Sequence, residues 1–367
     1  MALSLILRTC SRSKLSCKLT HPAISYSNSS GEKPNEIRKS HEKSVYKREE
    51  AKRIRFYILN RFIEYLKNYD KVLEKNFPTT MKTYKVFTEG TWSFIADTRH
   101  YFKIVAMLNS SKGSYTKLLR REIELQHQMP KDITKVAPVL LFSTLPFAFY
   151  ILLPLIYALP KQLLTSHFWT EEQKVKFETE YLHDRLVHNK PVFRHLQSQL
   201  KFIKHHRKNR DLYEKWNKTL GLLGSGDQPT IECILACKEL FKDEPYHLLY
   251  LSRNHVFHLL RVHGIHAGWF RRTRLADRAL GLIEMDRAIM REGGVHNLPL
   301  EALRKACYLR GFHTKDVSHK CQIQWLTDWI KISSNTDKDS LSLLLHAPIF
   351  LGYNEPSNWR LLHPERV

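Results

Sequence analysis

Residues 292–311 read EGGVHNLPLEALRKACYLRG, and this stretch decides the fold because it holds a helix end, a turn and a complete short helix. A charged helix predicted over 269–292 stops at the glycine pair that follows it. Pro299 opens the next helix, since its fixed φ suits the first helical turn. Gly311 closes that helix, whose apolar residues share one face. They are Leu300, Leu303 and Cys307.

The same helical spacing extends from this stretch through 160–367, and no segment alternates with the period of two expected of a strand. We therefore predict an all-α fold for this region. Residues 341–351 (LSLLLHAPIFL) are apolar but too short to cross a membrane, and they predict the end of a core helix. Further helices are predicted over 170–189, 191–218, 231–241, 252–264 and 321–330, with a loop at 221–230.

Upstream of this region, residues 136–159 form an uncharged run of 24 residues bracketed by Lys135 and Lys161. As a helix the run would be about 36 Å long, which exceeds a bilayer core of about 30 Å. A buried core helix is the alternative, but each internal proline costs such a helix about 3 kcal/mol, whereas membrane helices tolerate proline better. The run is therefore predicted to be a single transmembrane helix. Its prolines are Pro138, Pro146 and Pro154.

The residues before this run divide into two predicted parts. Residues 1–30 are basic and serine-rich, with no acidic residue before Glu32. This composition is typical of a mitochondrial presequence, although a disordered basic tail shares it. Residues 31–135 are predicted to form an N-terminal helical region, interrupted at Pro130. Its aromatic and basic content suits either a membrane surface or a packed helix.

The whole chain has 367 residues and a formal net charge of +23, from 59 Lys and Arg against 36 Asp and Glu. Such a surplus favours an anionic partner, which is nucleic acid, a ribonucleoprotein or an anionic membrane. It is spread along the chain, because residues 161–367 hold 32 basic and 23 acidic residues. The six cysteines are too few and too scattered for a disulfide scaffold.

Two basic patches are candidate contacts for RNA. The first lies on the helix predicted over 191–218, where contacts to phosphates would make binding salt-dependent. The second adjoins Trp269 and Phe270, and arginine beside an aromatic ring suits unpaired bases. For each patch a solvated helix face is the alternative, and cardiolipin is a third candidate near the membrane. The two sets are Lys201, Lys204, Arg207, Lys208 and Arg210, and Arg271, Arg272, Arg274 and Arg278.

Neither a metal site nor a catalytic site is predicted. Cys233 and Cys237 have a spacing that zinc sites use, but no second ligand pair follows, so packing within a helix is favoured. Four histidines lie close together in sequence, yet a glycine interrupts their helix and no carboxylate pattern accompanies them. No zinc-protease, phosphate-binding, nucleophile-elbow or dinucleotide motif occurs, so we expect no enzyme and no cofactor. The four histidines are His255, His258, His263 and His266.

The order of these motifs resembles the mitochondrial LETM family. The uncharged run with its prolines, and the approach LLRRE at 118–122, are similar to that family's membrane segment. Downstream, EGGV at 292–295, WL at 325–326 and LLL at 343–345 follow in the family's order. Residues 160–367 are thus identified as a ribosome-binding domain of the LETM type. Its motif residues are Leu303, Ala306, Cys307, Arg310 and Gly311.

The resemblance implies an inner-membrane protein whose C-terminal domain lies in the matrix, binds the mitochondrial ribosome and has a helical fold similar to 14-3-3 proteins. It implies a scaffold that supports mitochondrial translation, respiratory-chain biogenesis and mitochondrial structure, with inner-membrane lipids as further partners. The chain is most like the family's short members, since it has no EF-hand loop of the D-x-D-x-D-G type. The alternative function is a subunit of a potassium–proton exchange system. That function would need a homo-oligomer or other membrane proteins, because the predicted span carries no charge.

Charge near the predicted span favours a different orientation from the one that the family implies. Within about 20 residues of the span, the N-terminal side carries five basic residues and the C-terminal side three. By the positive-inside rule, this excess of basic residues predicts that the N-terminal side of the span lies in the matrix. We follow the family, because a difference of two charges is small and a mitochondrial ribosome is met only in the matrix. The outer membrane is disfavoured on the same ground.

Overall fold

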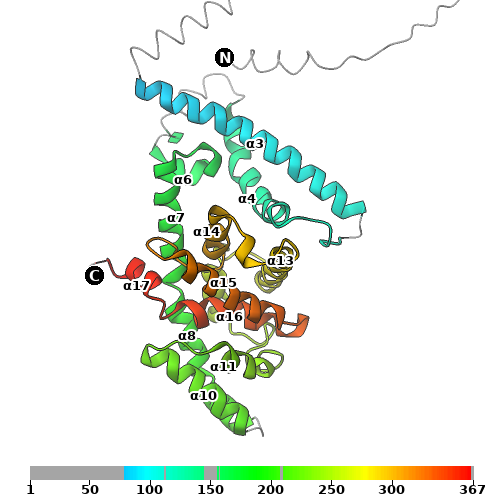
Figure 1. Cartoon of the computed structure of the whole chain (residues 1–367), viewed down its shortest axis with the longest axis vertical. Coiled ribbons are helices and arrows are strands. Elements are labelled where there is room, and N and C mark those ends of the chain that lie inside the picture. Colours follow the sequence, from blue (N-terminus) through cyan, green and yellow to red (C-terminus); the bar gives the residue numbers. More distant parts are fainter. Residues whose placement is uncertain (1–77, 111–112, 144–154, 157, 207–209, 365–367) are drawn as a thin grey trace, which may run out of the picture. The chain divides into compact units, whose positions relative to one another are not determined.

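A computed structural model of the chain describes residues 78–110, 113–143, 155–156, 158–206 and 210–364. The regular structure in these residues is entirely helical, which confirms the all-α prediction (Figure 1). Contacts divide the chain into two units, 1–78 and 79–367. The second unit contains the helices described below. The predicted presequence and all of residues 31–77 lie outside the described residues.

The described part begins with two long helices, α3 (Pro78–Ser110) and α4 (Arg120–Ser143). The later α-helices are α6 Pro160–Leu163, α7 Glu171–Leu186, α8 Asn189–Ser198, α9 Leu200–His206, α10 Arg210–Ser225, α11 Ile231–Ala236, α12 Arg253–Val262, α13 Arg271–Arg291, α14 Leu300–Leu309, α15 His319–Ser334, α16 Leu341–Gly352 and α17 Pro356–Leu362. Short 3-10 helices join them: η1 Ser166–Phe168, η2 Lys238–Phe241, η3 Val295–Asn297 and η4 Lys338–Ser340.

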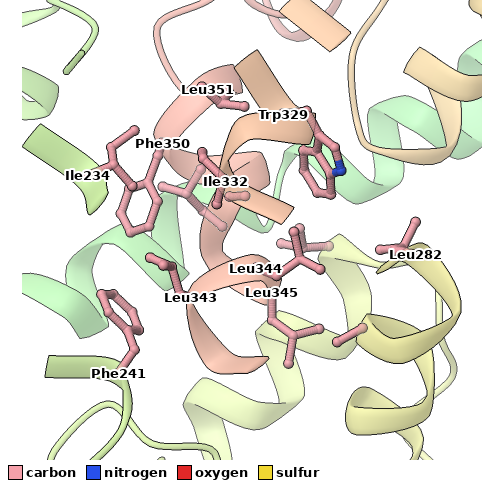
Figure 2. Close-up of a cluster of buried hydrophobic side chains, with 14 of the residues drawn as sticks. Ile234, Phe241, Leu282, Trp329, Ile332, Leu343, Leu344, Leu345, Phe350 and Leu351 are labelled. Carbon is pink, nitrogen blue, oxygen red and sulfur yellow. The ribbon is translucent and has the colours of Figure 1, made fainter. Parts of the chain in front are cut away.

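The core is built around α16, the helix that the apolar residues 341–351 predicted. Its residues from Ser342 to Gly352 are all buried, as expected of a helix that is apolar on every side. Helices α8, α13 and α15 and the turn η2 pack against it. Figure 2 shows leucines of α16 among Phe241, Trp329 and Leu282, which come from η2, α15 and α13. Pro348 lies inside the helix without ending it.

Most predicted helix starts and stops are confirmed. Thr170 forms a capping box with Gln173 at the start of α7, and Ser252 accepts a hydrogen bond from the His255 backbone N–H at the start of α12. Helix α13 ends at the glycine pair of the opening motif, and both glycines have the positive φ that favours glycine.

The long basic helix predicted over 191–218 is wrong in its boundaries. The chain forms α8, α9 and α10 instead, and residues 207–209 between α9 and α10 lie outside the described residues. The loop predicted over 221–230 also starts later, since α10 continues to Ser225. Leu220 and Leu223 are buried, and their packing holds the helix beyond the predicted end. Gly226, at a φ of 98°, then turns the chain.

The prediction that Pro130 interrupts the N-terminal helical region is also wrong. Helix α4 continues through Pro130 and Pro138. Met129 and Val136 on α4 are buried against Phe94 of α3, and burial of large side chains offsets the cost of proline. Helix α4 packs on α13 as well. The N-terminal helices are therefore packed into the same unit as the helices that follow the apolar run.

The prediction of a single transmembrane helix needs correction in the part of the run that the structure describes. Its first eight residues, 136–143, end a helix that begins at Arg120, and Pro146 and Pro154 lie outside the described residues. In the described ranges, no helix combines the length and apolar character needed to cross a membrane. The two ends of the run are also close together, because Lys135 Nζ donates a hydrogen bond to the Lys161 carbonyl at 2.6 Å.

Candidate functional site

The family-type motif forms helix α14 and the turn after it. Leu303, Ala306 and Cys307 are fully buried and face the core. Burial raises the pKa of the Cys307 thiol to about 12, so this cysteine is a packing residue rather than a nucleophile. Gly311, at a φ of 92°, turns the chain after the helix. Arg310 between them is the unexpected member, since it points into the protein.

Arg310 is held by a buried acid and by its own helix. Its Nη2 lies 2.5 Å from Asp286 Oδ1, and its Nη1 donates to the Ala306 carbonyl at 2.7 Å. Trp329 Nε1 donates to the other oxygen of Asp286 at 3.0 Å. Both charged groups are almost completely buried. The pair thus connects α14, α13 and α15 in the interior, where losing one partner leaves an unpaired charge.

Two further arginines share this interior with Arg310. Arg185 of α7 donates to the carbonyls of Val262, Tyr308 and Leu309, at 2.8, 2.8 and 3.2 Å. These carbonyls lie at the C-terminal ends of α12 and α14, where the helix dipole favours a cation. Arg278 of α13 also donates to the Leu309 carbonyl, at 3.1 Å.

We call Arg185, Arg278 and Arg310 the buried arginine cluster. Arg278 as a residue is half-buried, but its Nε is inaccessible to solvent. Burial, together with the charges of the other two arginines, lowers the pKa of Arg278 to about 9. Most donors of the cluster point at backbone carbonyls and one internal acid, whereas the Nε atoms of Arg278 and Arg310 are buried without a hydrogen-bond partner among the described residues. Its chemistry is therefore suited to joining helix ends rather than to binding an external anion.

The four arginines of the second predicted RNA patch have different surroundings in the structure. Arg272 donates to the carbonyls of Leu248 and Leu251, and Arg274 donates to the carbonyl of His266, so both tie loops to α13. Arg278 belongs to the buried cluster. Arg271 is exposed and donates to the Gly268 carbonyl at 3.2 Å.

The aromatic pair beside this patch is highly exposed. Trp269 is 87% exposed and Phe270 79% exposed. Phe270 has a φ of 52°, a left-handed conformation that costs a bulky residue about 1–2 kcal/mol. Two exposed rings at a strained position form a surface suited to stacking.

The first predicted RNA patch is only partly described. Lys201 and Lys204 lie on α9 and are exposed, whereas Arg207 and Lys208 lie outside the described residues. Arg210 starts the next helix and forms an exposed ion pair with Glu214 at 2.9 Å. The prediction that this patch lies on one helix is thus wrong, because α9 and α10 are separate helices.

Sequence reasoning missed Arg185 and Asp286 as important residues. A signal was present for each. Arg185 occupies the apolar face of α7, beside Leu182 and Leu186, and Asp286 occupies the apolar face of α13. A charged residue at a core position of an amphipathic helix predicts a buried partner. The partner itself could not be predicted, since it comes from another helix.

Of the four clustered histidines, two lie against another histidine, and His263 Nε2 lies 2.9 Å from the Leu345 carbonyl oxygen. His255 Nε2 lies 2.8 Å from His346 Nε2 in the core, and His188 Nδ1 lies 3.0 Å from His258 Nδ1 nearer the surface. Burial lowers the pKa of His346 to about 4. Within the described ranges, no group of three or more histidines, cysteines and acids could hold a metal ion. Cys237 is buried, as its predicted packing role requires.

Comparison with known proteins identifies the family. The family model described as "LETM1-like, RBD" matches residues 118–350. The chain is 28% identical over 291 residues to "LETM1 domain-containing protein 1" of Homo sapiens, covering 78% of this chain and 79% of that protein. It is 29% identical over 256 residues to "LETM1 domain-containing protein mdm28, mitochondrial" of Schizosaccharomyces pombe, covering 67% of this chain and 52% of that protein. The matched residues include α4, the buried arginine cluster and most of α16, so the chain belongs to the LETM1-like family.

Proposed function

We propose that this protein is attached to the mitochondrial inner membrane and binds the mitochondrial ribosome through its helical domain. In this role it supports mitochondrial translation, respiratory-chain biogenesis and mitochondrial structure. The observation that carries the proposal is the family match over residues 118–350, to the LETM-type domain that the motif order also indicates. The word "mitochondrial" in the name of the Schizosaccharomyces pombe relative supports the location.

The exposed groups around the domain suit ribosomal RNA. Lys201, Lys204 and Arg271 are exposed cations, and such groups bind phosphates in a salt-dependent manner. Trp269 and Phe270 offer rings on which unpaired bases can stack. The buried arginine cluster supports part of this surface indirectly, since Arg278 and Arg310 hold α13, which begins next to Trp269 and Phe270.

Membrane attachment is proposed to come from the apolar run 136–159, half of which lies outside the described residues. A run without charge over 24 residues is stable in a bilayer. The domain is proposed to face the matrix, where mitochondrial ribosomes are assembled and used. Its likeness to 14-3-3 proteins stays a prediction.

Sedimentation of the full chain with mitochondrial ribosomes tests the proposal. We expect the tagged protein, released from mitochondria in mild detergent, to migrate with ribosomes at about 50 mM salt. It should leave the ribosomal fraction at about 200 mM salt, because contacts to several phosphates weaken steeply over this range. An inner-membrane protein without a basic surface serves as the control. Absence from the ribosomal fraction at low salt would contradict the proposal.

A further inference from the structure

Helix α3, drawn in blue and cyan in Figure 1, buries one side against other helices of its unit. On this side, Phe94 packs with Met129 and Val136 of α4, and Ile104 packs with Met285 of α13. The aromatic and basic content of this region suits either a packed helix or a membrane surface. Packing accounts for the buried side only, so the opposite side needs a separate explanation.

The opposite side of α3 exposes a row of mostly apolar side chains. Five residues at intervals of three or four positions share this face of the helix. Phe102 is 61% exposed and Trp92 43% exposed, and among the described residues neither ring stacks on an aromatic group of another helix. The row is about 21 Å long. It consists of Trp92, Ile95, Arg99, Phe102 and Ala106.

The exposed side of α3 is also basic. Its exposed cations are Lys85, Arg99 and Lys103, whereas the exposed acid in the described part of this helix is Glu89. Arg99 and Lys103 have no acidic partner among the residues that the structure describes. Long basic side chains can lay their apolar stems along lipid and place their charges at phosphates. Aromatic and aliphatic side chains beside such cations are typical of a helix that lies on an anionic membrane.

Short contacts fix α3 to the chain on both sides of the apolar run 136–159. Phe94 shares a buried cluster with Val136, at the start of the run, and its ring lies 6.2 Å from that of Phe168, after the run. Gly90 lies so close to His167 that a Cβ there would overlap the His167 carbonyl oxygen. The described residues of the run include further exposed apolar side chains, which are Leu141, Phe142, Leu155 and Leu159.

We propose that the exposed side of α3 lies on the surface of an anionic membrane. Trp92 and Phe102 then lie at the level of the headgroups, and Arg99 and Lys103 contact lipid phosphates. The proposal rests on the membrane attachment proposed above, because that attachment brings α3, fixed beside the described ends of the run, to the bilayer. It goes beyond the attachment by giving α3 its own lipid-binding face.

A membrane fits this face better than ribosomal RNA does. RNA would use the cations and the two rings, but it would leave Ile95 and Met107 without an apolar partner. Met107 is 41% exposed, and a lipid surface covers such aliphatic side chains together with the aromatic ones. The surplus of exposed cations over exposed acids on α3 matches the negative charge of cardiolipin.

Spin labelling of the full chain in vesicles tests the proposal. Ala106→Cys places a label on the exposed side of α3, and the native Cys321 on α15 gives an exposed reference position. Each label is studied alone, with Cys10, Cys17 and Cys233 replaced by serine and, for the α3 label, Cys321→Ser added. The vesicles contain phosphatidylcholine with cardiolipin, or phosphatidylcholine alone. Collisions of the label with oxygen report contact with lipid, and collisions with a nickel complex on both sides of the vesicle report contact with water.

We expect the ratio of oxygen to nickel collisions at position 106 to be several-fold higher with cardiolipin than without it. The ratio at Cys321 should not change. Each cation strengthens contact with an anionic surface about fivefold, so Arg99→Glu with Lys103→Glu should lower the ratio of lipid-contacting to water-exposed label by more than about tenfold.

A matched variant controls for the change in net charge. Lys315→Glu with Lys320→Glu also reverses two exposed cations in the same unit, and it should leave the signal at position 106 unchanged. Circular dichroism of both double variants checks that the helical fold is kept. An equal loss of lipid contact in the two double variants would contradict the role of α3.

Other outcomes separate this proposal from the membrane attachment on which it rests. A label that stays in water at position 106, in a chain that still floats with the vesicles, would overturn the proposal and leave the attachment intact. A chain that does not float with the vesicles would contradict both. Equal lipid contact with and without cardiolipin would contradict the preference for an anionic membrane.

Two further outcomes would give the face to another partner and overturn the proposal. Shielding of the label from both oxygen and nickel, together with spin–spin broadening, would show that a second copy of the chain covers the face. Shielding that appears only after mitochondrial ribosomes are added would show that the ribosome covers it.

Discussion

The buried arginine cluster and the exposed cations of α9 and α13 place side chains of the same charge in opposite surroundings. Arg185 and Arg310 donate to internal carbonyls and to Asp286, and they are nearly inaccessible to solvent. Lys201 and Lys204 are exposed. A cation in the interior contributes to stability only while its partner is present, whereas an exposed cation contributes little to stability and can bind a partner. The net charge of the sequence counts both kinds equally.

The largest expected effect comes from breaking the buried ion pair. Arg310→Met removes the charge but keeps much of the side-chain volume, and it leaves Asp286 buried without its cation. We expect the free energy of unfolding to fall by about 3–5 kcal/mol. Chemical denaturation of the purified chain, followed by tryptophan fluorescence, measures the change.

A matched exposed arginine on the same helix provides the control. Arg304 forms a surface pair with Glu301 at 3.5 Å. Arg304→Met should change the free energy of unfolding by less than about 0.5 kcal/mol. If the two substitutions lower the free energy of unfolding equally, burial does not determine how much an arginine contributes to stability.

The buried histidine pair predicts a loss of stability in acid. Burial lowers the pKa of His255 to about 2 and that of His346 to about 4, against an ordinary value of 6.5. The unfolded chain therefore binds protons that the folded chain does not, and stability is lost as the pH falls below about 6.5. At pH 5 each histidine should cost about 2 kcal/mol relative to pH 8.

Denaturation at pH 8 and pH 5 measures this slope. His346→Phe places an apolar ring beside Phe241 and Phe350 and removes one of the two titrating groups. We expect the variant to lose less stability than the wild type between the two pH values. An unchanged slope would show that other groups determine the acid sensitivity.

Sequence and structure agree where a signal is local. Capping at Thr170 and Ser252, and the stop at Gly293, depend on residues within one turn, and these predictions are confirmed. The core role of 341–351 follows from its apolar character on every side. Predictions failed where distant packing decided the outcome, as in the passage of α4 through Pro130.

The distinction between local signals and distant packing also explains which features of the candidate site could be predicted. The sequence indicated basic patches, but it could not show that Arg272 and Arg278 donate to carbonyls from distant parts of the chain. Nor could it show that Lys135 and Lys161, which lie 26 positions apart, are in contact. Contacts of this kind depend on tertiary structure, and residue spacing alone does not contain them.

A smaller effect is expected at the exposed aromatic pair. Phe270→Gly relieves the left-handed backbone, so we expect the free energy of unfolding to rise by about 1 kcal/mol. If the ring stacks on ribosomal RNA, binding should weaken even though the fold is more stable. Trp269→Ala is the control for binding alone, since it removes the neighbouring ring without altering the strained residue. If the Phe270→Gly variant is more stable and still binds ribosomes fully, the ring of Phe270 is not part of the binding surface.

The smallest effect on stability is expected for the exposed lysines of α9. Replacing Lys201 and Lys204 together by alanine should change the free energy of unfolding by less than about 0.5 kcal/mol, because both side chains are exposed. If both contact phosphates, the logarithmic slope of ribosome binding against salt should become shallower by roughly 1.5. Co-sedimentation at several salt concentrations measures that slope, with Arg304→Met as a variant that also removes one exposed charge. An equal change per removed charge in both variants would assign the effect to net charge, whereas a change confined to the lysines places the ribosomal contact on α9.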